Sequence, residues 1–346
     1  MSVPPPSGEG NRDAAEGAKR GSWLARLKPD WYLIFILAAA GLASVLPARG
    51  EAAFAFGWAS KILIGIVFFL HGARLSREAV IRGLTHWRLH LTILAATFLL
   101  FPAITVGMAA LPAWITPPEI AGGLVLLGCL PSTIQSSIAF VGIARGNVAA
   151  AVASASASNM IGVFLTPALA SLLLHAEGAI SPGSFWAIVL QLFAPFVAGQ
   201  IARPWIGAFV QRHNKTLGLL DRGTIVLIVY VAFSGAVVAG VWNRLSALDL
   251  VRLLVLCCVL LAAVLAITAF AARALGFSKE DEIAIVFCGS KKSLASGAPI
   301  AAALLTPAAA GIAMIPLMIF HQIQLMACAA IAQRYARRAD TAAESV

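Results

Sequence analysis

Two polar stretches, CLPSTIQSS at residues 129–137 and FCGSKKSLASG at residues 287–297, interrupt apolar runs that extend over residues 119–144 and 282–304. Both apolar runs are long enough to cross a bilayer. In the hydrocarbon region each polar or backbone group without a hydrogen-bond partner costs roughly several kcal/mol of free energy. Neither stretch can therefore face lipid. Each stretch therefore has to line a cavity or pack against other polar groups. The polar partners that these two interruptions require constrain how the whole chain can fold.

The composition places the whole chain in a membrane. Of 346 residues, 60% are hydrophobic and 12% are charged, against about 45–50% and about 25% in soluble domains. About 20 residues of helix cross the roughly 30 Å of hydrocarbon. We therefore predict an all-α integral membrane protein with ten spans. The spans are 30–47, 56–73, 89–111, 119–144, 147–174, 183–202, 223–241, 250–274, 282–304 and 308–333.

The basic residues predict the orientation of these spans. With ten spans, 19 of the 25 Lys and Arg residues lie on the side of the amino terminus and 3 lie on the other side. Basic residues in short loops mark the cytoplasmic side. We therefore expect a multi-pass protein of a bacterial-type inner membrane or plasma membrane, with cytoplasmic tails at residues 1–28, expected to be disordered, and 335–346. The basic excess then reports topology, and no nucleic-acid partner is expected.

The two polar interruptions also indicate an internal symmetry. Cys129 and Cys288 are 159 residues apart, and one further span follows each interruption. Two halves of five spans would enter the membrane with opposite polarity, as in the inverted repeats of secondary transporters, whose broken helices meet near the midplane. The alternative is a pair of polar kinks that serve helix packing alone.

The candidate site consists of polar residues in the interruptions and in the spans that follow them. All 15 acidic residues lie in loops, tails or span ends, so a buried acidic proton relay is not expected. No cofactor and no confident metal site is predicted. The candidate substrate- or ion-binding residues are Pro131, Ser132, Thr133, Gln135, Ser136, Ser137, Ser154, Ser158, Ser290, Lys291, Lys292, Ser293, Ser296, His321 and Gln322.

These interruptions, together with ARGNVA at residues 144–149 and LTPA at residues 165–168, resemble the bile acid:sodium symporter family, the solute carrier 10 group. The polar stretches themselves look like its divergent SBF-like branch. The resemblance implies a core domain of spans three to five and eight to ten, in which spans four and nine cross. It also implies a panel domain of spans one, two, six and seven that moves against the core. The implied ranges are 29–82 and 183–245 for the panel and 83–182 and 246–334 for the core.

The sequence departs from the family at the sodium sites. Typical members carry Ser-Asn on span four, hydroxyls on span five, and Glu with Gln on span nine. The matching positions here hold Ser136-Ser137, Ala151 and Ala155, and Phe287 and Lys291. Two lysines would repel sodium, so sodium coupling is not expected. One ammonium could occupy a cation position among backbone carbonyls, could bind an anionic substrate, or could carry a proton.

We therefore predict a secondary transporter that moves a small organic anion by alternating access in the bilayer. Of the two candidate coupling ions, sodium and a proton, the lysines disfavour sodium. The alternative is a membrane regulator or scaffold with a degenerate transport site. An enzyme is disfavoured because the sequence holds no HExxH or GxSxG motif and no cluster of carboxylates. The sequence predicts no oligomeric state.

The predicted topology can be tested by cysteine labelling. A single cysteine in the 175–182 loop should react with an impermeant thiol reagent added outside intact cells, because that loop is predicted to be external. A cysteine in the 203–222 loop should react only after the membrane is opened. The reverse pattern would contradict the orientation.

Overall fold

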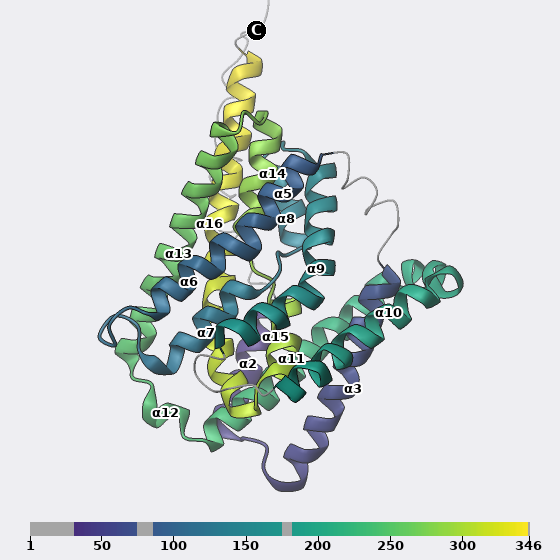
Figure 1. Ribbon diagram of the computed structural model, residues 1–346, viewed down its shortest axis with the longest axis vertical. Coiled ribbons are helices and arrows are strands. Elements are labelled where there is room, and N and C mark those ends of the chain that lie inside the picture. Colours follow the sequence, from purple (N-terminus) through teal and green to yellow (C-terminus); the bar gives the residue numbers. More distant parts are fainter. Residues whose placement is uncertain (1–30, 75–85, 175–181, 345–346) are drawn as a thin grey trace, which may run out of the picture.

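The computed structural model describes residues 31–74, 86–174 and 182–344, and the regular elements in these ranges are all helices (Figure 1). The predicted tail at residues 1–28 lies outside the described residues, and so does the predicted loop at residues 175–182 except for Pro182, which begins a helix. The helices are α2 (Trp31–Val45), α3 (Gly50–Arg74), α5 (Trp87–Ala95), η2 (Ala96–Leu100), α6 (Phe101–Ala109), α7 (Pro118–Cys129), α8 (Gln135–Ile143), α9 (Val148–Leu174), α10 (Pro182–Arg212), α11 (Asn214–Val238), α12 (Val241–Arg244), α13 (Ala247–Ala274), α14 (Lys279–Gly289), α15 (Leu294–Leu304) and α16 (Pro307–Glu344).

The described helices confirm the all-α membrane class. Six are long and apolar enough to cross a membrane: α3, the continuous α5–η2–α6 segment, α9, α11, α13 and the first part of α16. Two shorter apolar helices are Ile34–Val45 and Pro118–Cys129. Each of the ten predicted spans overlaps a helix or a pair of helices, while the ten-span inverted repeat stays a prediction.

Both polar interruptions lie where a helix breaks. Helix α7 ends at Cys129, and Leu130 is extended because the ring of Pro131 disfavours the helical conformation of the preceding residue. Helix α14 ends at Gly289, and Ser293 begins α15 as an N-cap whose hydroxyl accepts a hydrogen bond from the Ser296 amide at 3.1 Å. The sequence therefore encodes the two breaks by different means.

The two breaks are bonded to each other, as the sequence predicts. The Ser293 amide donates to the Pro131 carbonyl at 2.9 Å, and the Ser132 hydroxyl donates to the Cys288 carbonyl at 2.6 Å. This exchange joins segments about half the chain apart. Backbone groups freed by each break are satisfied by the other, which is the condition for irregular backbone at membrane depth.

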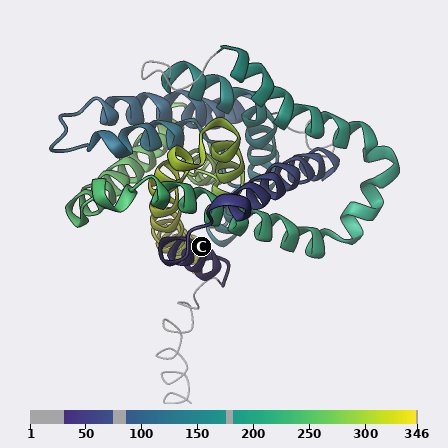
Figure 2. The same ribbon diagram turned by 90° about the horizontal axis from the view of Figure 1, so that it is seen from below.

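Helices α3 and α10 run side by side on the right of both views (Figures 1 and 2). A Cβ atom on Gly72 would overlap the Phe196 carbonyl, and one on Gly199 would overlap the Phe69 carbonyl. Small residues let membrane helices approach closely, so these two glycines allow backbone contact from both sides. The neighbouring α11 packs against α2 and α3 on one side and against α15 and α16 on the other.

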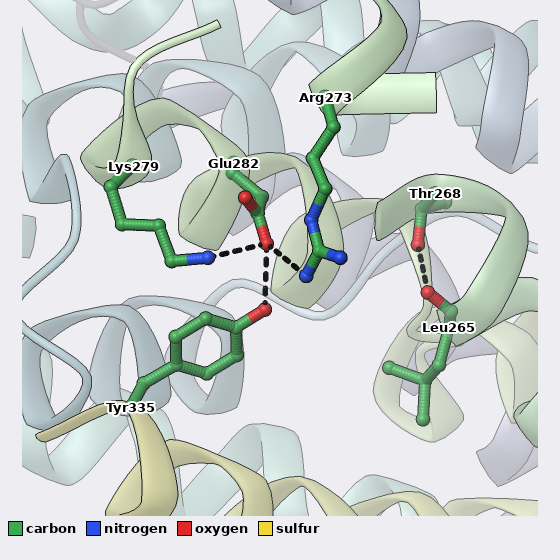
Figure 3. Close-up of polar contacts among 6 residues, drawn as sticks. All are labelled: Leu265, Thr268, Arg273, Lys279, Glu282 and Tyr335. Carbon is green, nitrogen blue, oxygen red and sulfur yellow. Dashed lines mark hydrogen bonds and ion pairs between the residues drawn. The ribbon is translucent and has the colours of Figure 1, made fainter. Parts of the chain in front are cut away.

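A carboxylate at the start of α14 ties three helices together. Arg273 of α13, Lys279 of α14 and Tyr335 of α16 all donate to one oxygen of Glu282, at 3.0, 2.8 and 3.0 Å (Figure 3). Glu282 is buried. The sequence pattern assigns residues 335–344 to a tail, but in the structure they continue helix α16. The hydrogen bond between Tyr335 and Glu282 explains why Tyr335 belongs to the packed part of the helix bundle.

The substitution Glu282→Gln should lower the melting temperature of the protein in detergent. Hydrogen bonds to a charged group contribute about 1.5–3 kcal/mol, and the exposure of Arg273 and Lys279 places the loss toward the lower end. Glu280→Gln is the matched control, because Glu280 lies in the same helical turn and is exposed. Equal shifts in the two variants would contradict the role of Glu282.

Candidate functional site

A cavity of about 740 Å³ lies between α2, α3 and α11 on one side and the two helix breaks with α9 and α16 on the other. The breaks contribute hydroxyl and amide groups to one wall. The candidate residues from the sequence that line this cavity are Pro131, Thr133, Gln135, Ser136, Ser293, Ser296 and His321. A polar wall of this kind can hold a polar solute without a backbone group facing lipid.

The opposite wall carries an excess of positive charge. It holds Arg74, Lys215 and Arg222 but a single carboxylate, that of Asp221. Arg74 forms an ion pair with Asp221 through one nitrogen, while its Nε and Nη2 atoms are buried without a hydrogen-bond partner in the described part of the chain. Guanidinium groups suit carboxylate-like ligands. The sequence patterns did not single out this wall, because its charged residues come from two separate helices, α3 and α11.

Behind the cavity, helix α9 holds both breaks. The Ser132 amide donates to the Ser158 hydroxyl at 3.0 Å, and the Asn159 amide nitrogen donates to the Ser132 carbonyl at 2.7 Å. The Ser296 hydroxyl donates to the side-chain oxygen Oδ1 of Asn159 at 2.7 Å. Asn159 therefore bridges the two breaks and lines the cavity. The sequence prediction missed it, although an amide directly after Ser158 in an apolar span was a usable signal.

The ammonium group of Lys292 lies inside the crossing and is fully buried. Its Nζ donates to the carbonyls of Thr97, Gly128 and Leu130 at 2.7, 2.6 and 2.7 Å. Nζ also lies 4.2 Å from the ring centroid of Phe101. An ammonium has three donors, so all of them are satisfied. The negative end of the α7 dipole adds a favourable field.

Local backbone structure explains why these carbonyls are free to bind Lys292. Gly128 and Leu130 lie at the end of α7, where the last carbonyls have no partner within the helix. Thr97 lies in the π-helical turn η2, in which the Phe101 amide donates to the Ala96 carbonyl. The next donor along that turn would be Pro102, which has no N–H. The Thr97 carbonyl is therefore left for the lysine.

Helix α16 clamps the backbone of Lys292. The Gln324 side chain accepts a hydrogen bond from the Lys292 amide at 2.9 Å and donates to the Lys292 carbonyl at 2.8 Å. Its nitrogen also lies 3.0 Å from Nδ1 of His321. Gln324 was not among the candidate residues, but its sequence signal was present: a second amide near the middle of an apolar span.

The carbonyl cage around Lys292 has the ligand type of an alkali cation site. Oxygen ligands suit hard cations, and the cationic group that lies among these oxygens is the Lys292 ammonium. No group of three or more His, Cys, Asp or Glu side chains within residues 31–74, 86–174 and 182–344 could hold a metal.

The other candidate residues lie outside the cavity and the cage. The Ser137 hydroxyl donates to the Phe287 carbonyl at 3.3 Å, and Ser154 pairs with His90 at 2.6 Å. Lys291 is buried with its Nζ 3.9 Å from the ring centroid of Phe140. Ser290 and Gln322 each hold a buried side-chain oxygen without a hydrogen-bond partner among the described residues. Neither lysine lines the cavity.

The cage predicts that a truncated Lys292 admits sodium. Lys292→Ala removes the donor of three buried carbonyls, each of which then costs about 1–3 kcal/mol, so its melting temperature in choline chloride should fall well below that of the wild type. Sodium chloride at equal ionic strength should raise it again, because an ion that binds the folded state stabilises it. Lys61→Ala, at an exposed position of α3, is the control. A Lys292→Ala protein indifferent to sodium would contradict the cation-site assignment.

Comparisons with known proteins identify the family of this chain. Residues 30–337 match the SBF-like CPA transporter family. The chain is 53% identical to an uncharacterized protein of Pseudomonas aeruginosa PAO1, over 93% of this chain and 97% of that protein. It is 48% identical to the candidate symporter YfeH of Escherichia coli K12, over 90% and 94%, and 29% identical to the mouse sodium/bile acid cotransporter 7, over 88% and 91%.

These matches confirm the resemblance stated from the sequence. They cover nearly all of the described chain, including both helix breaks and the cage around Lys292. The apolar helices and the family together make the chain a multi-pass membrane protein of a transporter family, not of an enzyme family. The chain therefore belongs to the SBF-like CPA transporter family.

Proposed function

We propose that this protein is a secondary transporter of the bile acid:sodium symporter type that moves a small organic anion by alternating access without sodium. The observation that carries the proposal is the Lys292 ammonium in its cage of three carbonyls. A cage that already holds a covalently attached positive charge has no room for an ion and would repel one. The names of two relatives, a candidate symporter and a sodium/bile acid cotransporter, support transport as the activity.

The position of the cavity supports alternating access. Its two walls belong to the two helix groups that the family resemblance assigns to a panel and a core domain. A rigid movement of α2, α3, α10 and α11 against the crossing would change the side from which the cavity is reached. The glycine contacts between α3 and α10 favour movement of these two helices as one body.

The charges of the cavity support an anionic solute. Three cationic side chains face it against one carboxylate, and two nitrogens of Arg74 have no partner within the described residues. The hydroxyls of Thr133 and Ser136 and the Gln135 amide lie on the opposite wall. A solute with an anionic group at one end and polar groups at the other would satisfy both walls.

A binding and uptake experiment tests this proposal. Thermal shifts of the purified protein with a panel of carboxylates and organic sulfonates, each paired with its neutral amide, would identify the anions that bind. Those anions should enter proteoliposomes at the same rate in sodium and in choline buffers. Uptake that requires a sodium gradient would restore a sodium symporter. If none of the tested anions binds or is taken up, a membrane regulator or scaffold would be favoured instead.

The anion site should depend on Arg74. Arg74→Gln should weaken binding of an anion from that panel about ten- to a hundredfold, the equivalent of the roughly 1.5–3 kcal/mol of a hydrogen bond to a charged group. The matched control is Arg252→Gln, because Arg252 is also paired with an acid, Asp249, but lies on α13 away from the cavity. Equal affinities in the two variants would remove Arg74 from the site.

A further inference from the structure

Lys291 occupies an environment opposite to that of its neighbour Lys292. It is fully buried, and its Nζ atom has the Cys328 thiol, a weak acceptor, as a partner but no geometrically regular hydrogen bond within the described part of the chain. Nζ lies 3.9 Å from the ring centroid of Phe140 and 5.9 Å from that of Phe287. The cation–π contact with Phe140 gives the charged form some stabilisation, but far less than three carbonyls would.

The groups around Lys291 supply no counter-charge. Its ionisable neighbours are the thiols of Cys288 on α14 and Cys328 on α16, and a thiol is a weak hydrogen-bond acceptor. Helices α8 and α9 contribute apolar residues to the same cluster, among them Val141 and Ala151. Burial of an ammonium without a counter-ion in such surroundings costs roughly several kcal/mol of free energy, whereas burial of a neutral amine costs little. The amine can therefore gain and lose a proton without breaking any strong hydrogen bond.

A chain of polar side chains links the cavity to this amine. The Ser136 hydroxyl, which lines the cavity, lies 2.6 Å from the hydroxyl of Thr133, and that of Thr133 lies 3.2 Å from the hydroxyl of Ser137. Ser137 is hydrogen-bonded to the Cys288 thiol, and Lys291 lies close enough to that thiol for its charge to act on it. Each hydroxyl can accept a proton on one side and release one on the other.

We propose that Lys291 is a reversible proton-binding site reached from the cavity through Ser136, Thr133, Ser137 and Cys288, and that its proton is the coupling ion of transport. Binding converts the neutral amine to an ammonium by adding one proton taken from the cavity water, and no other bond changes. The coupling part of this inference rests on the proposed function, whereas proton binding at Lys291 does not.

Electrostatics gives the coupling its direction. A proton on Lys291 adds a charge that has no counter-ion within the apolar cluster. An anion in the cavity would supply that counter-charge, and attraction between opposite charges is strong in a low-dielectric interior. Proton and anion therefore favour each other's binding, so they should move in the same direction. Lys292 cannot take this role, because its three donors are committed to carbonyls.

A difference proton titration of the purified, full-length protein in detergent tests the site without any solute. The wild type should bind one proton more per chain than Lys291→Met, at a pH clearly below about 10.4, where exposed lysines titrate. Lys61→Met is the matched control for the loss of a lysine from an apolar helix, because Lys61 is exposed. Lys291→Gln repeats the measurement in case the Met variant does not fold.

The hydroxyl chain has its own measurement. The rate of proton binding can be followed in stopped-flow pH jumps with an indicator dye. Ser137→Ala should bind the same number of protons as the wild type, but at least tenfold more slowly. This rate change corresponds to about 1.4 kcal/mol of activation free energy. An unchanged rate would overturn the path. A wild type that releases the additional proton only near about pH 10.4, where exposed lysines titrate, or that binds no additional proton, would overturn the proton site.

Coupling is measured separately in proteoliposomes. With an anion that passes the uptake test, an imposed pH gradient should drive accumulation by the wild type and not by Lys291→Met. Anion uptake by the wild type that ignores the pH gradient would overturn the coupling. If no anion is transported, the proposed function fails and coupling fails with it, but the titration still decides whether Lys291 binds a proton.

Discussion

The bond of the Lys292 ammonium to three backbone carbonyls is the interaction on which the centre of this protein depends. It collects the free carbonyl of the π-helical turn at Thr97 and two carbonyls at the end of α7, and Gln324 fixes the backbone from which the lysine extends. Without the ammonium, three buried carbonyls would lose their donors, which costs free energy. The break in α7 is stable because a lysine of the other half of the chain fills it.

Two adjacent lysines have different chemistry because they project to different sides of one break. Lys292 meets three carbonyl oxygens that favour its charged form, whereas Lys291 meets aromatic rings and thiols. A fixed charge can replace a structural ion, and a proton on an amine without strong partners can come and go. In a sodium symporter, bound sodium would serve both the structure and the coupling. Here Lys292 would take the structural role and Lys291 the coupling role.

The cavity shows a corresponding division between its walls. The breaks offer hydroxyls and amides that are themselves held by hydrogen bonds, as Ser296 and Asn159 are. The opposite wall offers Arg74 and other cations on helices whose mutual contact is close. One wall is thus rigid through polar bonds across the crossing, and the other is rigid through backbone packing. Such a pair of bodies can move past each other without rebuilding either interior.

The membrane class, the family and the position of both breaks could be predicted from the sequence alone, since Pro131 and the polar run near Ser293 act locally on the helix that contains them. The sequence also indicated that the breaks would meet, because polar groups at membrane depth require partners. Which lysine enters the carbonyl cage follows from the fold and not from the sequence pattern, because residues in a break follow no helical period and their directions depend on distant segments. Asn159, Gln324 and the cationic wall at Arg74 became part of the site for the same reason: their partners lie far away in the chain, and only folding sets those distances.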